Sequence, residues 1–407
     1  MSAAAFCLFL LVIAIEYLGI ISNYLPFLRG VPIALGSCFL LVLYLSLKEN
    51  ALKSLRYPEM KLLLCILFLS FLGVLHGLIK LYAIDVIKQQ VGYLVLAIIT
   101  FAVINSVQRF RIYSAFIVAI HCFLVVTNSH KLFQAREGSF KAGYFIGDGN
   151  DLAWSLLVTL PLAMYMLVTS KGKLKTVIFG VATMLIIVGI LGTQSRGAAI
   201  GLALSGGFMF FKILSEFPKI RRALLVPVII GAFFLPAAYL DRLGTVANYE
   251  EDTSAMGRIA AWGTAIEMAN DNFLGVGPGS FNSAYGRSYR KPDDPVRWIS
   301  THSIYFKVLA EYGYIGLICL LMVIYKAFSE SSRHIKRILA TYGNDNEYIL
   351  PMKFLMVMVI GYAVPGIFLT GVNYPHVYIM VGLIAAMRHH SMEQYSKLSI
   401  PDKRPRR

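Results

Sequence analysis

Two arginines and one histidine have residue types and positions that could do chemistry. Arg196 lies in Thr-Gln-Ser-Arg-Gly just before an apolar segment, Arg258 lies in Gly-Arg-Ile, and His302 lies in Thr-His-Ser at the start of another apolar segment. Two guanidinium groups can hold a diphosphate through paired N–H donors without a metal ion. An imidazole titrates near neutral pH, so it could take a proton from a hydroxyl group, or bind phosphate when charged. These three residues predict a reaction site.

Each of the three residues also has a simpler interpretation, which the residues alone leave open. Arg196 could extend its side chain to a membrane interface, Arg258 could pair with the acidic run 250–252, and His302 could be structural. The neighbours of Arg196 favour a binding role. Thr193–Ser195 are hydrogen-bonding residues at the expected start of a helix, where amide donors and positive charge together make a good phosphate receptor.

The composition places these residues in a membrane protein. Of 407 residues, 57% are hydrophobic and 15% are charged, far from the roughly one-quarter charged residues of soluble domains. Because only helices and closed barrels satisfy their backbone in lipid, apolar runs of about 18 residues or more predict an all-α polytopic membrane protein. Twelve spans are expected, at about 4–22, 31–47, 61–79, 88–105, 112–128, 151–169, 175–191, 197–214, 223–240, 303–325, 349–369 and 371–388.

Basic residues set the expected orientation. The net charge of +16 gathers in alternate short loops and in the tail, a pattern typical of cytoplasmic loops and not of nucleic-acid binding. Both termini are therefore expected in the cytoplasm. The expected organisation is nine spans in 1–240, a large periplasmic loop in 241–302, three spans in 303–390 and a basic cytoplasmic tail in 391–407.

The predicted outer side holds every candidate residue. Within the large loop, apolar spacing predicts a helix over about 256–269, before a turn-rich 275–280. The residues that recur there at helical intervals are Ile259, Trp262, Ile266 and Met268–Ala269. A second outward segment brings Arg136 and Lys141, which could contact sugar or phosphate. Asn150, in the same segment, could cap the next helix, and it is a candidate substrate-binding residue together with Arg136 and Lys141.

These motifs resemble a known family. His302 and Ser303, followed after nine residues by Gly313 and then by Gly316, match the H-[N/S/Q]-x9-G-x-x-G pattern of bacterial O-antigen ligases and related protein O-oligosaccharyltransferases. Thr193–Gly197 and Gly257-Arg258 resemble the two arginine motifs of that superfamily, in the expected order. The run Phe273–Phe281 is similar to its loop signature.

The resemblance implies a GT-C-like, metal-independent, inverting glycosyltransferase of the bacterial inner membrane. It would move a glycan from undecaprenyl diphosphate to a sugar hydroxyl of lipid A–core at the periplasmic face. Arg196 and Arg258 would hold the diphosphate, and His302 would activate the acceptor or assist at the phosphate.

No cofactor or metal is expected from the sequence, which has no Walker-type nucleotide loop. The acidic runs 250–252 and 293–294 are typical of solvated loops. An O-antigen or exopolysaccharide polymerase and a protein O-oligosaccharyltransferase remain alternatives. A transporter of lipid-linked glycan is a further one, with Lys307, Lys353 and His121 as its mid-membrane ionisable groups.

Overall fold

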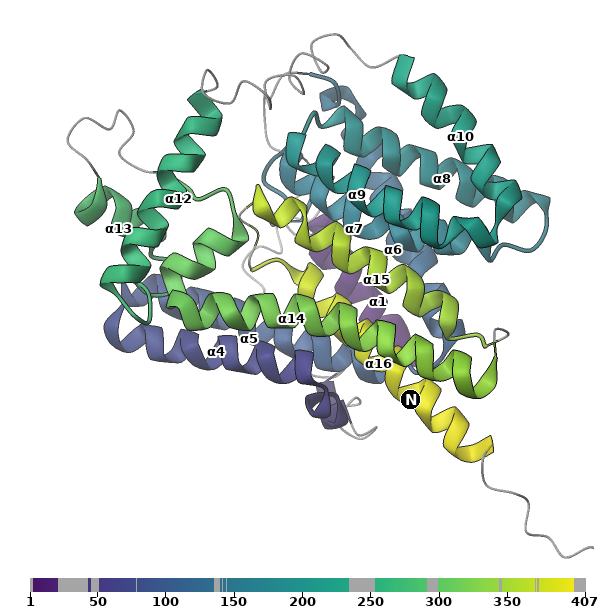
Figure 1. The fold of residues 1–407 in the computed structure, drawn as a ribbon, viewed down its shortest axis with the longest axis horizontal. Coiled ribbons are helices and arrows are strands. Elements are labelled where there is room, and N and C mark those ends of the chain that lie inside the picture. The colour runs from purple at the N-terminus through teal and green to yellow at the C-terminus, as the bar shows by residue number, and fades with distance from the viewer. Residues whose placement is uncertain are drawn as a thin grey trace, which may run out of the picture.

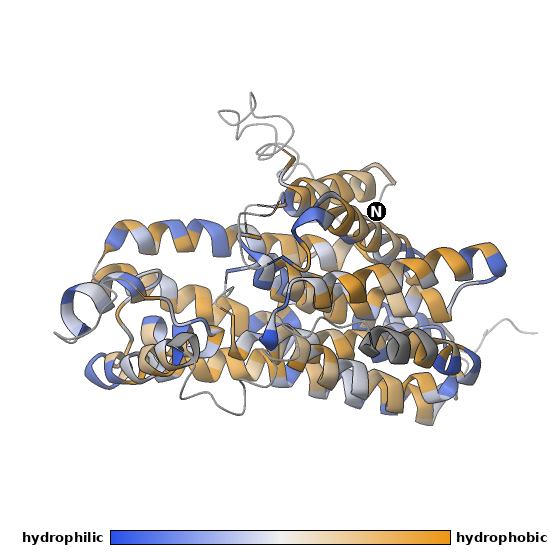
Figure 2. Ribbon diagram, turned by 90° about the horizontal axis from the view of Figure 1, so that it is seen from above, coloured by the Kyte–Doolittle hydropathy of each residue, from blue (hydrophilic) through white to orange (hydrophobic). Residues whose placement is uncertain are grey.

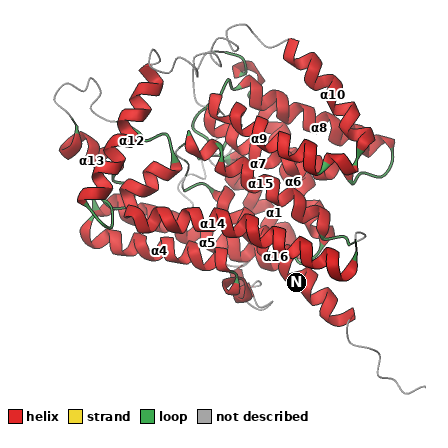
Figure 3. Ribbon diagram, in the orientation of Figure 1, coloured by secondary structure: helices red, strands yellow, loops and turns green. Residues whose placement is uncertain are grey.

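Helices and their connecting loops make up the whole described part of the chain, with no strand in it (Figure 3). The computed structural model describes residues 3–20, 43–44, 51–77, 79–134, 140, 142–143, 145–233, 253–290, 299–343, 346–369, 371 and 373–398. The expectation of an all-α polytopic membrane protein is confirmed.

Eight of the described helical segments are long and apolar enough to cross a membrane. Six of them are the single helices α4 (Pro58–His76), α5 (Lys80–Val103), α6 (Val107–Thr127), α7 (Gly149–Val168), α8 (Lys173–Gly192) and α14 (Ile304–Tyr342). The other two are α9 (Arg196–Lys212) with the short η4 (Leu214–Glu216), and α15 (Ile349–Ala363) with η7 (Pro365–Ile367). Their ribbons are apolar along most of their length, with hydrophilic residues gathered toward ends and turns (Figure 2).

The remaining described elements are shorter or less apolar. They are α1 (Ala3–Leu18), η2 (Ala51–Arg56), η3 (Ser129–Lys131), α10 (Pro218–Phe233), α12 (Thr253–Asp271), α13 (Phe281–Ala284), η6 (Tyr285–Tyr289) and α16 (Pro375–Leu398). The expected span at 31–47 lies outside the described residues except for 43–44, and the one at 223–240 is described only as far as Phe233.

Helix α7 forms the centre of one half of the bundle, in contact with α6, α8, α9 and α15 (Figure 1). Trp154 of α7 is completely buried, and its indole N–H donates to the Tyr362 carbonyl of α15 at 3.1 Å. The small residues of α9 allow close packing here, since a methyl group at Gly201 would lie 2.6 Å from Leu157 and from Pro365.

The other half joins α4, α5, α14 and α16. Ser70 of α4 donates to Gln90 of α5 at 2.6 Å, and the Gln90 amide donates to the Tyr312 hydroxyl of α14 at 2.9 Å. All three side chains are buried, so these hydrogen bonds fix three helices against one another away from water. At the far end of this half, the Arg388 guanidinium of α16 lies 2.7 Å from the fully buried Glu59 carboxylate of α4.

Helices α12 and α13 stand apart from the main bundle, beside the first part of α14 (Figure 1). The helix expected over 256–269 is therefore present and somewhat longer, as Thr253–Asp271. Helix α14, which follows α13 and η6 in the chain, is broken at Gly313, where φ is 67° and ψ is −170°. The break divides α14 into a short first part that begins just after His302 and a long second part.

Candidate active site

Arg196 is the first residue of α9, as the sequence predicts. The hydroxyl of Ser195 accepts from the Ala198 amide at 3.4 Å, which caps the helix start. Gln194 has a positive φ of 54°, and this turn reverses the chain between α8 and α9. Arg196 itself is half-buried, at the same end of the protein as this exposed turn.

The start of α7 adjoins the Arg196 motif. A methyl group at Gly149 would lie 3.5 Å from the Thr193 side chain, so the two helix starts are in contact. The residue that caps α7 is Asp148, whose carboxylate accepts from the amides of Asn150 and Asp151 at 2.8 and 3.0 Å. The prediction that Asn150 caps this helix is wrong, because the reciprocal capping box needs the carboxylates of Asp148 and Asp151. Arg136 and Lys141 lie outside the described residues.

Arg258 lies in the second turn of α12 and is half-buried. Trp262, one turn further along the same face, donates its indole N–H to the Thr301 carbonyl at 2.8 Å. The Trp262 ring also stacks on Phe306, with ring centroids 4.8 Å apart and planes 9° apart. This face of α12 is therefore fixed to the chain on both sides of His302.

The buried face of α12 matches the expected one only in part. Met268 and Ala269 are buried as expected, and so are Ala261 and Ala265, whereas Ile259 and Ile266 are 43% and 41% exposed. Small alanines let α12 approach α13 and α14 closely, and hydrophobic spacing alone does not distinguish that face from the isoleucine face.

His302 has a positive φ of 44°, in the left-handed region that residues other than glycine rarely adopt. Its neighbours Thr301 and Ser303 are almost completely buried, while His302 is exposed. The Thr301 hydroxyl donates to the Ser303 carbonyl at 3.1 Å across the turn. The strained turn thus directs the imidazole outward from two buried neighbours, and such strain is common where function requires it.

The short helix η7 and the residue after it pack against the starts of both α9 and α14. A methyl group at Gly197 would lie 2.8 Å from Phe368, which follows η7, and one at Gly366 would lie 2.7 Å from Ile304. The Tyr305 hydroxyl donates to the Ala363 carbonyl at 2.8 Å. Arg196 and His302 therefore belong to helix starts that contact the same segment, and Trp262 adds the Arg258 helix to them.

Arg196, Arg258, His302 and Asn150 thus come from elements that are linked to one another by a series of direct contacts. Two guanidinium groups and an imidazole on such linked elements can stabilise negative charge and move a proton. Trp262 and Thr301 hold this arrangement. The sequence pattern placed Trp262 only on the apolar face of the expected helix and gave Thr301 no role. The position of Trp262, one helical turn from Arg258, was a usable signal.

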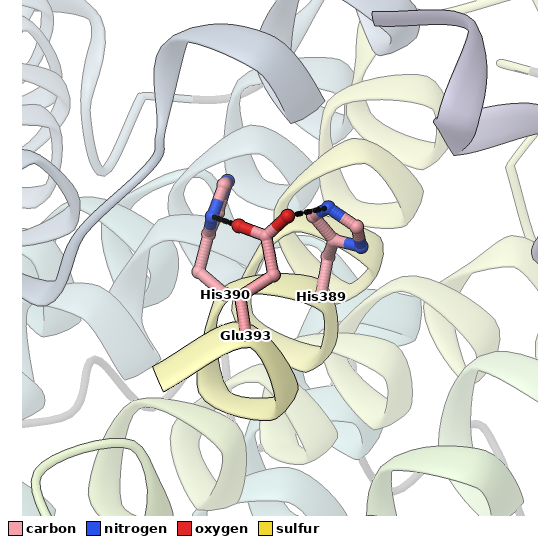
Figure 4. Close-up of side chains that lie close together, drawn as sticks. All are labelled: His389, His390 and Glu393. Carbon is pink, nitrogen blue, oxygen red and sulfur yellow. Dashed lines mark ion pairs between the residues drawn. The ribbon is translucent and has the colours of Figure 1, made fainter. Parts of the chain in front are cut away.

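Among the described residues, one group has the ligand types and spacing that could hold a metal ion, and it lies elsewhere. His389, His390 and Glu393 lie together in the C-terminal half of α16 (Figure 4). Each imidazole has a nitrogen within 3.3 Å of the Glu393 carboxylate. Lys53 of η2 lies 3.8 Å from the same carboxylate, so the group also fastens η2 to α16.

A cavity of about 910 Å³ opens at the opposite end from the candidate site. It is bounded by the start of α6, the end of α7 and the start of α15, and its lining includes Arg111, Lys171 and Lys353. Lys353 pairs there with Glu216. His121, another ionisable group that a transporter would use, also has a local partner, because its imidazole is hydrogen-bonded to the Ser155 hydroxyl at 2.7 Å.

Comparison with known proteins bears directly on the candidate site. Residues 179–321 match the family model described as O-antigen ligase. The matched segment runs from α8 into α14 and includes Arg196, Arg258, His302 and the break at Gly313. No curated protein matches the chain.

Proposed function

We propose, from the premise that the chain belongs to the O-antigen ligase family, that it is a glycosyltransferase acting on a lipid-linked glycan. In its finer form the proposal is transfer from undecaprenyl diphosphate to a sugar hydroxyl of lipid A–core, at the periplasmic face of the inner membrane. The observation that carries it is the meeting of the Arg196, Arg258 and His302 elements through η7 and Trp262. All three residues lie within the matched segment.

The reaction needs little beyond charge stabilisation and one proton transfer. The acceptor oxygen forms a bond to the anomeric carbon of the glycan as the bond from that carbon to the diphosphate oxygen breaks, which inverts the configuration. The diphosphate leaves with its electron pair, and Arg196 and Arg258 stabilise its charge. His302 takes the proton of the acceptor hydroxyl or, when already charged, binds the phosphate.

The acceptor distinguishes this proposal from its alternatives. Purified protein is incubated with undecaprenyl diphosphate-linked glycan and one of three acceptors: lipid A–core, a second lipid-linked glycan, or a pilin-like protein. Transfer to lipid A–core alone is the expected result. Elongation of the glycan would instead identify a polymerase, and labelled protein would identify an O-oligosaccharyltransferase. Transfer to none of the three would overturn the glycosyltransferase proposal.

Removal of either guanidinium group tests the diphosphate site. Arg196→Ala and Arg258→Ala should each lower kcat by about 10²–10³, the usual effect of losing one donor to a developing anion. Lysine at either position should restore part of the rate, because it keeps the charge but not the paired N–H donors. Arg287→Ala, which removes an exposed arginine of the same extramembrane segment, is the matched control. Near-normal transfer by both alanine variants would contradict the proposed roles.

A further inference from the structure

The break in α14 leaves backbone carbonyl groups that no amide of the helix can reach. Amides of the loop after α12 donate to these carbonyl groups instead. The Val276 amide donates to the Ala310 carbonyl at 2.8 Å, and the Gly277 amide donates to the Glu311 carbonyl at 3.2 Å. Gly275, whose φ is 76°, is in such close contact that a methyl group there would lie 2.4 Å from the Glu311 backbone. The loop is therefore docked onto α14 by its main chain.

The side chain of Glu311 holds the same loop from the other direction. It is 2% exposed, and its carboxylate accepts from the Phe281 amide at 3.3 Å and from the Gly279 amide. Phe281 begins α13 and is itself buried against α12 residues. Lys307, one turn earlier on α14, attracts the carboxylate electrostatically. A carboxylate buried at this depth and bonded to main-chain amides is not available to a substrate.

Helix α12 is thus attached to α14 at two places. The first is the contact of Trp262 with Thr301 and Phe306, beside His302, and the second is the loop held at Glu311. The distance along α14 from Phe306 to Glu311 is about 7 Å at the usual helical rise. One attachment would leave α12 free to pivot, whereas two set its direction.

We propose that Glu311 is a positioning residue that sets the place of Arg258 relative to His302. The proposal rests on the proposed function, because it assumes that these two groups act on one substrate. Glu311 acts by holding the loop 275–281, which fixes the C-terminal end of α12, while Trp262 fixes the face that carries Arg258. A displacement of about 1 Å in such a group can lower a rate roughly 10²-fold.

The first experiment measures docking without reference to activity. Hydrogen exchange of the full-length protein in detergent should show faster exchange of the 276–284 amides in Glu311→Ala than in wild type. Glu311→Gln keeps one acceptor oxygen and should protect most of these amides. Glu267→Ala removes an exposed carboxylate of α12 and should change nothing. Equal protection in Glu311→Ala and wild type would overturn the docking role.

The second experiment measures positioning. Glu311→Ala should lower kcat/KM for the lipid-linked donor roughly 10²-fold, leave the acceptor KM unchanged, and be largely restored in Glu311→Gln. If Glu311 acts through Arg258, its removal should cost much less in an Arg258→Lys background than in wild type. Equal losses in the two backgrounds would overturn the positioning role.

The two proposals can fail separately. Faster exchange with normal transfer in Glu311→Ala would refute positioning and leave the glycosyltransferase proposal intact. Absence of transfer by the wild type to any acceptor would refute the function, while the exchange experiment would still decide the docking role. If Glu311→Ala does not accumulate, Glu311→Asp can be used, because it moves the carboxylate back by one methylene. Glu311→Asp should show the same faster amide exchange and lower kcat/KM, each to a smaller extent. Wild-type exchange and kinetics in the aspartate variant would count against the proposal.

Discussion

A single methyl group at Gly313 should displace the loop that docks at the break in α14. Gly313 has a φ of 67°, and a Cβ there would lie 2.1 Å from the Phe273 carbonyl oxygen and 3.2 Å from the Gly275 nitrogen. Both contacts are with main chain, so a side-chain rotation cannot relieve them. Gly313→Ala should therefore drive the loop away from α14.

The loss of stability in Gly313→Ala can be estimated from the backbone strain and the hydrogen bonds that are lost. Alanine in the left-handed conformation costs about 1 kcal/mol. The withdrawn loop also loses the hydrogen bonds from Val276 and Gly277, each worth about 1 kcal/mol net. The total of about 3 kcal/mol is the expected loss of folding stability, equivalent to roughly a hundredfold fall in the ratio of folded to unfolded protein.

Hydrogen exchange and thermal unfolding measure this loss, and one control isolates its cause. In Gly313→Ala the Val276 and Gly277 amides should exchange up to about a hundred times faster, with a lower unfolding midpoint. Gly263→Ala makes the same chemical change in α12, where no atom lies within 4 Å of the new methyl group. That control should be neutral or stabilising by up to about 1 kcal/mol. Unchanged exchange in Gly313→Ala would refute the account of the break.

Three further outcomes are expected. Trp262→Phe keeps an aromatic ring but loses the N–H that donates to the Thr301 carbonyl. The kcat/KM for the lipid-linked glycan should therefore fall about fivefold, which corresponds to a loss of about 1 kcal/mol. An unchanged kcat/KM would show that this hydrogen bond does not support the site. His302→Ala should slow turnover by roughly 10²–10⁴ in the transfer assay, and wild-type turnover would make His302 a structural residue. Burial lowers the pKa of His390 from 6.5 to about 4, against an opposing effect of Glu393, so the unfolded chain binds a proton that the folded chain disfavours. The contribution of neutral His390 to folding stability is therefore full above pH 6.5 and is lost as the pH falls to about 4. His390→Asn should flatten the decline of the unfolding midpoint between these two pH values. An identical decline in wild type and variant would contradict this prediction.

Much of the helical plan could be predicted because its causes are local. The long apolar runs predicted the membrane helices, and Ser195 predicted the start of α9 since a hydroxyl caps a helix from a fixed distance. The helix around Trp262 was likewise predicted from its spacing.

Other features depend on contacts between distant parts of the chain, which spacing does not encode. Gly313 fits a helical run equally well whether the helix continues or breaks, and it breaks because the loop at 275–281 replaces the lost hydrogen bonds. Asp148 and Asn150 are both residue types that cap helices well. Asp148 is the cap because Asp151, three positions later, completes the capping box. The exposed Ile259 and Ile266 show the same limitation, since the buried face of α12 is decided by what packs against it.

The ion pair between α4 and α16 has a consequence for how the protein is made. Glu59 and Arg388 are 329 residues apart in the chain. At ribosomal rates of about 5–20 residues per second, the carboxylate is synthesised roughly twenty seconds to a minute before its counterion. A lone carboxylate is costly to bury, so α4 must keep Glu59 hydrated or protonated while the intervening helices insert. Completion of the bundle at this end therefore waits until α16 has been synthesised and inserted.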